Sequence, residues 1–313
     1  MAWTPDDIPE LSGHVVVVSG ATSGLGLETA RELGRKGARV VMAARNRDKA
    51  LHARRKITAD LPDADLEIRE LDLASLESVR ACAHGIVADH GKVHLLINNA
   101  GVMGVPEQET AEGFEMQLGV NHLGHFVLTR HLLPALLAAP AARVVSVTSF
   151  ARLMGHPIDP DNPHLRGMYD PWRAYAQSKL ANLHFAVELQ RRLETAGGNI
   201  QSVVAHPGLS HTDLQARSVR ETGGGTSQRF WHLMARAIGR PADHGARPVL
   251  RAATDPGARG GELYAPKWGS FGAPVRRPLF RRPDRRATRT LWEVSERETG
   301  ERFDVAQIVK KAT

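Results

Sequence analysis

Hydrophobic positions along the chain follow two alternating spacings, one typical of buried strands and the other of amphipathic helices. Short apolar runs rich in β-branched residues predict seven strands, at residues 15–19, 39–44, 66–71, 93–97, 143–149, 200–206 and 262–264. Apolar residues at intervals of three and four predict helices between them, starting near residue 25 and covering 48–61, 75–90, 113–137, 173–195 and 241–253. Strands and helices therefore alternate along most of the chain.

Strands that alternate with helices pair in parallel through right-handed crossovers, which indicates a doubly wound α/β fold. We expect a single domain over residues 1–313 with one mostly seven-stranded parallel sheet flanked by helices. Residues 209–240 are expected to form a substrate lid and residues 265–313 an irregular basic C-terminal extension. Ligands of such sheets bind beyond the carboxyl ends of the strands. The residues predicted at those ends are Gly20, Arg45, Asp72, Asn99, Ser149 and Pro207.

Composition indicates the class of protein and its compartment, but it does not distinguish between folds. The 313 residues are 42% hydrophobic and 24% charged, as in ordinary soluble globular proteins. The single cysteine, Cys82, excludes an internal disulfide, fits a reducing compartment and is predicted on the inner face of a helix. No apolar run approaches the ~20 residues that span a bilayer, and the N-terminal residues lack a signal-peptide pattern. We therefore expect a cytoplasmic protein without a membrane span.

The net charge of +7 is concentrated near the C-terminal end. The arginines crowded there are Arg276, Arg277, Arg281, Arg282, Arg285, Arg286 and Arg289. Such a cluster can bind phosphates of nucleic acid or an anionic membrane surface. It contains only one aromatic residue, Phe280, and matches no nucleic-acid motif. We expect a solvated surface and no nucleic-acid partner.

The first strand leads into a glycine-rich turn that indicates a phosphate site. Gly20, Gly24 and Gly26 allow a tight turn and let the backbone approach a ligand. The helix that follows directs free N–H groups at the turn, where they would stabilise a diphosphate. The alternative is a plain strand-turn-helix whose glycines serve geometry alone.

A second group of residues indicates proton transfer. Tyr175 and Lys179 are four residues apart and share one face of a predicted helix. An ammonium at ~4 Å and an effective dielectric of ~20 would contribute about 4 kcal/mol and lower the phenol pKa by roughly two to three units. Ser149 ends the preceding strand, where it either holds a substrate oxygen or only caps a turn. Asn121 lies in an apolar helix and either kinks it or holds a water near Lys179.

These residues resemble the motifs of short-chain dehydrogenases/reductases, and the resemblance extends over residues 15 to about 296. The segment 19–26 is similar to the family's cofactor loop, with serine where threonine is usual. Asn-Asn-Ala-Gly at 98–101 is similar to the sheet-stabilising motif, and Pro-Gly-x-x-x-Thr at 207–212 to the nicotinamide-side loop. The catalytic tetrad is matched in order by Asn121, Ser149, Tyr175 and Lys179.

This resemblance implies a Rossmann fold and hydride transfer between a nicotinamide and a carbon atom of the substrate. It implies that Tyr175 is the general acid or base and that Ser149 orients the carbonyl or hydroxyl. Lys179 would bind the nicotinamide ribose and lower the tyrosine pKa, and Asn121 would hold the proton-relay water. The residues implied to bind the cofactor are Gly20, Thr22, Ser23, Gly24, Leu25, Gly26, Arg45, Asp72, Leu73, Asn99, Ala100, Gly101, Tyr175, Lys179, Pro207, Gly208 and Thr212.

The end of the second strand predicts the choice between the two nicotinamide cofactors. An acidic residue there would bind ribose hydroxyls and repel a 2′-phosphate. This chain has Ala44 there, followed by Arg45 and, two residues later, Arg47. A guanidinium favours a phosphate through charge-assisted hydrogen bonds. The sequence therefore predicts NADP(H).

The substrate is predicted less directly. The insert between Ser149 and Tyr175 and the ending 291–296 are similar to the retinol-dehydrogenase and protochlorophyllide-reductase-like branch, which suggests a lipophilic alcohol or carbonyl compound. The predicted lid contains apolar residues that could cover such a substrate or pack a small core of their own, namely Leu209, Leu214, Phe230, Trp231, Leu233 and Met234.

Other functions are weaker hypotheses. A catalytically silent dinucleotide-binding regulator would keep the fold but would not need the tetrad. His122 and His125 are three residues apart, yet no third ligand is evident, so no metal site is predicted. A homo-oligomer is left open.

Overall fold

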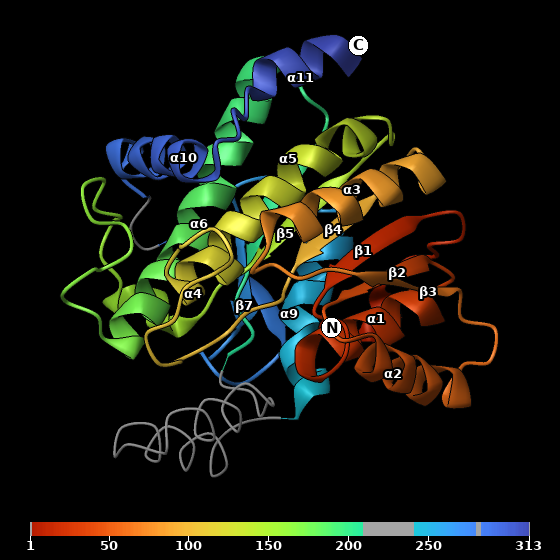
Figure 1. Ribbon diagram of the computed structural model, residues 1–313. Helices are drawn as coiled ribbons and strands as arrows, with labels where there is room; N and C mark the ends of the chain where they lie inside the picture. Colours follow the sequence, from red (N-terminus) through yellow and green to blue (C-terminus); the bar gives the residue numbers. More distant parts are fainter. Residues whose placement is uncertain (1, 209–240, 280–282, 313) are drawn as a thin grey trace.

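Eight strands form one sheet in the computed structural model, which describes residues 2–208, 241–279 and 283–312 (Figure 1). The strands are β1 (Val15–Ser19), β2 (Arg39–Ala44), β3 (Leu66–Glu70), β4 (Leu95–Asn98), β5 (Arg143–Val147), β6 (Gln201–Ala205), β7 (Leu263–Pro266) and β8 (Pro274–Arg277). Their spatial order is β3-β2-β1-β4-β5-β6-β7-β8. Neighbouring strands pair in parallel except for the antiparallel pair β7 and β8. The predicted doubly wound sheet is confirmed, with one additional edge strand.

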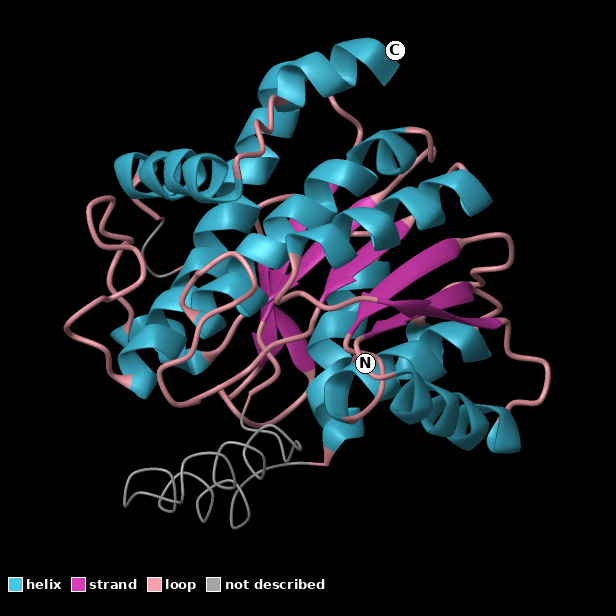
Figure 2. Cartoon of the chain, viewed as in Figure 1, coloured by secondary structure: helices cyan, strands magenta, loops and turns pink. Residues whose placement is uncertain are grey.

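Helices cover both faces of the sheet (Figure 2). The longer helices are α1 (Gly24–Arg35), α2 (Arg47–Asp60), α3 (Leu76–His90), α5 (Gly124–Leu137), α6 (Pro171–Ala196), α9 (Ala242–Thr254), α10 (Arg285–Thr299) and α11 (Val305–Ala312). The short helical elements are 3-10 turns at Pro5–Asp7 and Phe150–Met154, the turn α4 (Met116–Leu118) and a π-helical segment at Gly119–Leu123. Each predicted helix is present, within a few residues of its expected ends.

The valine run of β1 shows why most positions of the central strands are apolar. Val16 and Val18 face the core shared with α1, α2 and α9, whereas Val17 faces the core shared with α3, α5 and α6. Successive side chains of a strand point to opposite faces, and both faces are covered here, so apolar residues are favoured at successive positions. Helices α10 and α11 lie outside α5 and α6 and form a further layer on that side (Figure 1).

The predicted irregular C-terminal extension is wrong. Residues 265–313 contain the end of β7, strand β8 and helices α10 and α11. Thr288, Leu291, Trp292, Ser295 and Thr299 are buried along one face of α10, at spacings of three and four. The helical spacing of these positions is therefore present in the sequence. The many arginines and prolines around it make that spacing hard to recognise. Trp292 packs into the core of α5 and α6, with its ring centroid 5.2 Å from that of Phe126.

The helix predicted over 113–137 is interrupted. A short turn, α4, leads into the π-helical segment Gly119–Leu123 before α5 continues to Leu137. A π turn inserts one extra residue into the helical ladder, and such turns are frequent at functional sites. Asn121 lies within it, which supports the expectation of a kink at this residue.

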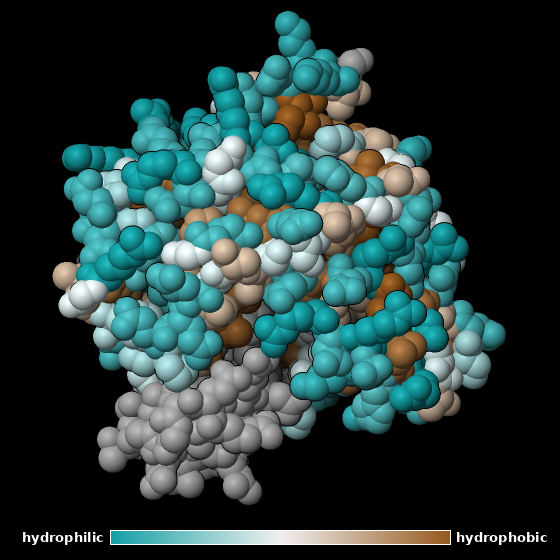
Figure 3. All heavy atoms as spheres, viewed as in Figure 1, coloured by the Kyte–Doolittle hydropathy of each residue, from teal (hydrophilic) through white to brown (hydrophobic). Residues whose placement is uncertain are grey.

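The character of the surface and of the helices can be seen directly. The face seen in Figure 3 is mostly hydrophilic, with small separate hydrophobic areas. Of the helices in the described ranges, none has both the length and the apolar character that crossing a bilayer requires. Cys82 is buried in α3 within the core, as predicted.

Candidate active site

The turn between β1 and α1 is closed so tightly that glycine is favoured at three places. Gly20 has a φ of +71° and Gly24 a φ of +54°, a region that L side chains rarely adopt. A Cβ on Gly26 would overlap the carbonyl oxygen of Gly20 and lie 2.6 Å from Nδ2 of Asn99. Ser23 precedes α1, and its side chain makes no capping bond to the helix. The start of α1 therefore keeps backbone N–H groups available at the turn.

Ser19 fastens this turn to the next strand. Its Oγ accepts hydrogen bonds from the backbone N–H of Asn99 at 2.9 Å and of Ala100 at 3.0 Å. Asn99 Nδ2 in return donates to the Ser19 carbonyl at 2.9 Å. A Cβ on Gly20 would lie 3.0 Å from Ala100. The Asn-Asn-Ala-Gly segment predicted to stabilise the sheet thus lies directly beside the glycine turn.

Tyr175 and Ser149 meet at the carboxyl end of β5. Tyr175 is buried on α6 beside Ala151 and Ala176. A hydrogen bond with the Ser149 side chain favours the phenolate, but burial outweighs it and raises the pKa of Tyr175 to about 12. Ser149 Oγ also accepts from the backbone N–H of Ala151 at 3.3 Å, so the serine caps the following turn as well as meeting the phenol. The serine thus caps the turn and also meets the phenol, and its role in holding a substrate oxygen stays a prediction.

Lys179 lies one helical turn beyond the tyrosine. Its Nζ is 5.8 Å from the centroid of the Tyr175 ring and donates to the Val147 carbonyl at 3.4 Å. Burial lowers the pKa of Lys179 to about 8. The expected lowering of the phenol pKa is wrong for the protein alone, because both groups are buried and desolvation exceeds the attraction across this distance. At neutral pH the phenol is protonated and the amine is mostly charged.

Asn121 is held in place by three hydrogen bonds. Its Oδ1 accepts from the Val102 backbone N–H at 2.7 Å, and its Nδ2 donates to the Val102 carbonyl and to Ser178 Oγ, each at 2.9 Å. A Cβ on Gly101 would lie 2.8 Å from Asn121 Oδ1 and 3.4 Å from Lys179 Nζ. Asn121, Gly101 and Lys179 thus come together, and Asn121 ties the π-helical segment to α6.

The remaining predicted cofactor residues surround this centre. Arg45 follows β2, is exposed, and makes no ion pair within the described part of the chain. Asp72 accepts from the Ala74 backbone N–H at 3.0 Å, and Leu73 lies against Gly124 at the start of α5. Thr22 is half-buried in the glycine turn and Leu25 is buried in the first turn of α1.

Pro207 and Gly208 follow β6, where Gly208 has a φ of +79° and lies against Ser270. Thr212 and the whole predicted lid at 209–240 fall outside the described residues.

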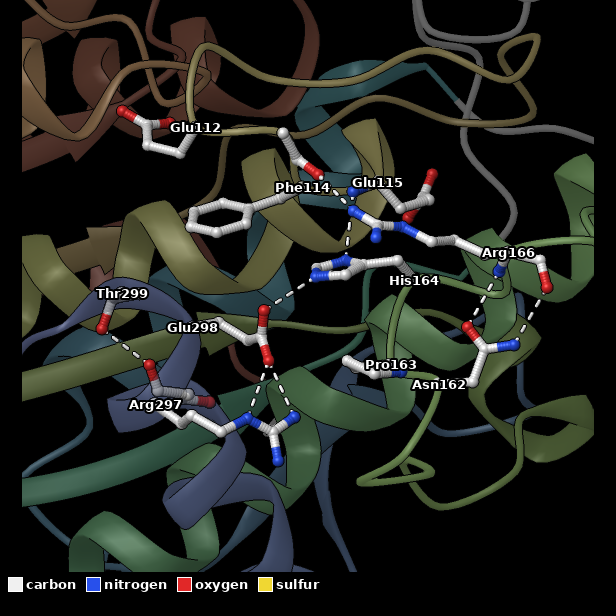
Figure 4. A network of polar contacts seen from close by, with 12 residues as sticks. Glu112, Phe114, Glu115, Asn162, Pro163, His164, Arg166, Arg297, Glu298 and Thr299 are labelled. Carbon is white, nitrogen blue, oxygen red and sulfur yellow. Dashed lines mark hydrogen bonds and ion pairs between the residues drawn. The ribbon is translucent and has the colours of Figure 1, made fainter.

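The insert between Ser149 and Tyr175 is anchored to both sides of the centre. In Figure 4, His164 lies between Glu115 and Glu298. Its Nδ1 accepts from the Glu115 backbone N–H at 3.1 Å, and its Nε2 donates to the Glu298 carboxylate of α10 at 3.0 Å. Gln177 of α6 donates to the Pro163 carbonyl at 2.8 Å. The insert therefore contacts three elements. They are the segment before Asn121, helix α6, which carries the candidate catalytic residues, and helix α10.

Several residues that position the centre were not predicted. Thr148 Oγ1 donates to the Lys179 carbonyl at 2.6 Å, and Asn182 Nδ2 donates to the Val147 carbonyl at 3.0 Å. His125 contacts both Ser19 and the Asn121 carbonyl. A signal for the histidine exists in the sequence, because Asn121, His125 and Thr129 repeat every four residues in an otherwise apolar helix.

Comparisons with known proteins agree with this arrangement. The sequence profile of short chain dehydrogenases matches residues 14–223. Retinol dehydrogenase 12 of Homo sapiens is 44% identical over 213 residues, which are 67% of this chain and 65% of that protein. The chain thus matches slightly less than two thirds of that relative's length. Polyprenol dehydrogenase of Mus musculus is 39% identical over 305 residues, covering 95% of this chain and 87% of that protein.

A solved structure extends the likeness to the whole fold. An uncharacterised protein from Mycobacterium Paratuberculosis shares 41% identity with a TM-score of 0.78, covering 97% of this chain and 99% of that one. The matched family profile covers more than half of the chain, and two relatives are named as dehydrogenases of retinol and of polyprenol. The chain belongs to the short-chain dehydrogenase/reductase family of oxidoreductases, in its retinol dehydrogenase-like branch.

Proposed function

We propose that this protein is an NADP(H)-dependent oxidoreductase that transfers a hydride between a nicotinamide and the carbonyl or alcohol carbon of a lipophilic substrate. One observation carries the proposal. The phenol of Tyr175, the hydroxyl of Ser149 and the ammonium of Lys179 are gathered at the same end of the sheet as the glycine turn. The turn that can hold a phosphate thus has three groups beside it. They are a proton donor, a hydroxyl that can orient an oxygen atom, and a cation.

The residues at the turn fit a dinucleotide. A diphosphate needs backbone N–H donors and close approach, and the start of α1 provides both because Gly24 and Gly26 carry no Cβ. Ser23 and Thr22 bring hydroxyls that can donate to phosphate oxygens. Asp72 and Leu73 would flank the adenine, and the 99–101 segment would line the path toward the nicotinamide. When bound, the nicotinamide supplies or accepts the hydride.

Residues of the chain itself transfer the proton and stabilise the charge that this transfer produces. With a pKa near 12, the Tyr175 phenol keeps its proton at neutral pH and serves as the acid that protonates a carbonyl oxygen during reduction. Ser149 donates a hydrogen bond to that oxygen and so orients it toward the phenol. The buried ammonium of Lys179 stabilises the phenolate left behind, since an opposite charge favours the ionised form. In the oxidising direction the phenolate takes the proton back.

Asn121 supports this proton transfer through its position in the π-helical segment. Both protons of its amide are used by Val102 and Ser178, and Oδ1 accepts one bond from Val102, so we assign the backbone carbonyl as the group that binds water. That carbonyl has two lone pairs, of which His125 uses one. A relay water for Lys179 would be held there.

The preference for NADP(H) rests on Arg45. The carboxyl end of β2 is the place where a dinucleotide's adenosine ribose binds in this fold. No acidic residue follows Ala44, and the Arg45 guanidinium is exposed and without an ion-pair partner in the described ranges. It is therefore available to a 2′-phosphate.

The lipophilic substrate is supported by exposed apolar side chains near the centre. Leu153 and Met154 are 72% and 61% exposed on the 3-10 turn that begins directly after Ser149. Trp268 is 71% exposed in the β7–β8 turn, where Gly269 lies against Phe150. The names of the retinol and polyprenol dehydrogenase relatives point to the same substrate class.

The test is turnover of a substrate panel with purified protein. NADPH oxidation is followed at 340 nm with retinaldehydes, long-chain aliphatic aldehydes and steroid ketones, against hydroxy sugars and short polar ketones as controls. We expect activity with the lipophilic group and a lower KM for NADPH than for NADH. Activity confined to polar substrates would refute the substrate class. Tight NADPH binding without turnover of any compound would refute the oxidoreductase assignment.

A further inference from the structure

A stripe of buried polar side chains runs along one face of the helix that contains Asn121. Asn121, His125 and Thr129 are 0%, 3% and 0% exposed. Burying polar groups is costly unless each is hydrogen-bonded, so their partners reveal what the stripe does. Thr129 Oγ1 donates to the His125 carbonyl at 2.7 Å and accepts from Asn98 Nδ2 at 3.0 Å. The stripe therefore faces the carboxyl ends of β1 and β4, beneath the glycine turn.

His125 is the centre of this stripe and has two partners. Its Nε2 lies 2.8 Å from Ser19 Oγ, and its Nδ1 lies 3.0 Å from the Asn121 carbonyl oxygen. Ser19 belongs to the strand that ends in the glycine turn, and Asn121 to the segment beside Lys179. One side chain thus joins the proposed phosphate site to the proposed proton-transfer site.

The hydrogen atoms of this junction can be assigned from the donors and acceptors. A carbonyl only accepts, so Nδ1 must carry the proton that binds Asn121. Ser19 Oγ already accepts from the backbone N–H groups of Asn99 and Ala100, which uses both of its lone pairs. The Ser19 hydroxyl must therefore donate, and of its two possible acceptors Nε2 is nearer, at 2.8 Å against 3.3 Å for the Ile97 carbonyl.

Charge supports the same assignment. Burial, together with the nearby charge of Lys179, lowers the pKa of His125 to about 4, so the ring is neutral at physiological pH. A doubly protonated ring would direct a second N–H at a hydroxyl that has no lone pair left. The neutral ring with its proton on Nδ1 satisfies every group at the junction.

We propose that His125 is a positioning residue that holds the Ser19 hydroxyl and the Asn121 carbonyl at once. It thereby fixes the distance between the glycine turn, where the dinucleotide would bind, and the side chains of Asn121 and Lys179. The imidazole directs the Ser19 proton away from β4, which leaves the serine oxygen free to hold the Asn99–Gly101 segment. It also fixes the carbonyl of the π-helical segment. This proposal rests on the proposed dinucleotide binding.

The same helix offers a matched control. His122 is also buried and neutral, and its Nε2 lies 2.8 Å from Ser295 Oγ on α10, on the side away from the glycine turn. Replacing either histidine by leucine removes a buried imidazole and its hydrogen bonds at a similar depth. The two variants differ in whether the lost bonds lead to the dinucleotide turn.

The experiment compares His125→Leu, His125→Gln and His122→Leu with the unaltered protein. We expect His125→Leu to weaken NADPH binding, measured by calorimetry, by about tenfold, which is ~1.4 kcal/mol. His125→Gln should recover most of that loss, because an amide both donates and accepts. His122→Leu should lower the melting temperature to a similar extent while leaving the NADPH Kd unchanged. Ser19 retains Ile97 O, at 3.3 Å, as an alternative acceptor, so His125→Leu is expected to fold.

The proposal is overturned if His122→Leu and His125→Leu weaken NADPH binding equally, or if His125→Gln binds no better than His125→Leu. A second readout needs no cofactor. In ¹⁵N spectra of imidazole-labelled protein, the signals that His125→Gln removes should show a protonated Nδ1 and an unprotonated Nε2, unchanged between pH 6 and 8. The opposite tautomer would also overturn it. Neither readout requires turnover, so failure of the oxidoreductase assignment would leave both results interpretable.

Discussion

The sharpest structural prediction concerns Gly26, on the first turn of α1. A Cβ placed there would overlap the Gly20 carbonyl oxygen and lie 2.6 Å from Asn99 Nδ2, closer than real Cβ contacts. Both neighbours belong to the junction that holds the dinucleotide turn, so neither can move without shifting the turn. Overpacking of this kind costs about 1–3 kcal/mol. For a domain of this size that corresponds to a loss of roughly 2–5 °C in Tm.

Gly34 on the same helix provides the matched control. A Cβ there would meet Leu66 Cδ2 at 3.5 Å and Ala64 Cβ at 3.6 Å, which are ordinary contacts. Replacing a helix-interior glycine by alanine stabilises by about 0.5–1 kcal/mol, since less backbone freedom is lost on folding. Gly34→Ala should therefore raise Tm by roughly 1–3 °C, whereas Gly26→Ala lowers it.

The assay is thermal unfolding of both variants with and without NADPH, together with the Kd for NADPH. We expect Gly26→Ala to weaken binding at least tenfold, about 1.4 kcal/mol, and to lose the rise in Tm that the ligand gives to the unaltered protein. Gly34→Ala should bind normally. If the two alanine variants were equally stable and bound NADPH equally well, the tight closure of the turn would be refuted.

Three further predictions test other parts of the structure. Arg45→Ala should raise the KM for NADPH about tenfold or more and leave that for NADH unchanged; equal effects on both cofactors would contradict the role of the guanidinium. Burial raises the pKa of Glu115 from 4.5 to about 7, so the folded state loses relative stability as pH rises from 4.5 through 7. In urea unfolding at pH 5 and pH 8, Glu115→Gln should remove about 2–3 kcal/mol of that loss; an unchanged pH dependence would contradict it. Trp292→Ala should cost about 3–5 kcal/mol because the ring is 1% exposed, measured by the same unfolding; a cost below ~1 kcal/mol would contradict its place in the core.

Most of the sheet could be predicted because its signals are local. A strand covered on both faces needs mostly apolar residues, as in the four valines of β1, and most strand ends are followed by a polar or glycine residue. Strand β8 and helices α10 and α11 could not be predicted in this way. Their apolar positions are few, and packing shows which ones are buried: β8 pairs with β7 and contacts α9, whereas α10 and α11 pack against α6.

The grouping of the candidate residues at one end of the sheet could be predicted, but their electrostatics could not. The spacing of Tyr175 and Lys179 places them on one helix face, yet it does not reveal that both are buried. Burial reverses the expected direction of the tyrosine pKa. The partners of His125 likewise depend on the contact between α5 and two strands, which no local pattern contains.

Replacement of the Tyr175 hydroxyl tests the central assignment most directly. Tyr175→Phe should reduce kcat for NADPH-dependent carbonyl reduction by about 10²–10⁴-fold, the usual contribution of a general acid, while the NADPH Kd stays unchanged. Tyr264→Phe is the control and should keep full activity, because that hydroxyl donates to Glu262 at 3.3 Å and lies on β7, two strands away from β5. Unchanged turnover in Tyr175→Phe, with NADPH still bound, would contradict the assignment of this phenol as the proton donor.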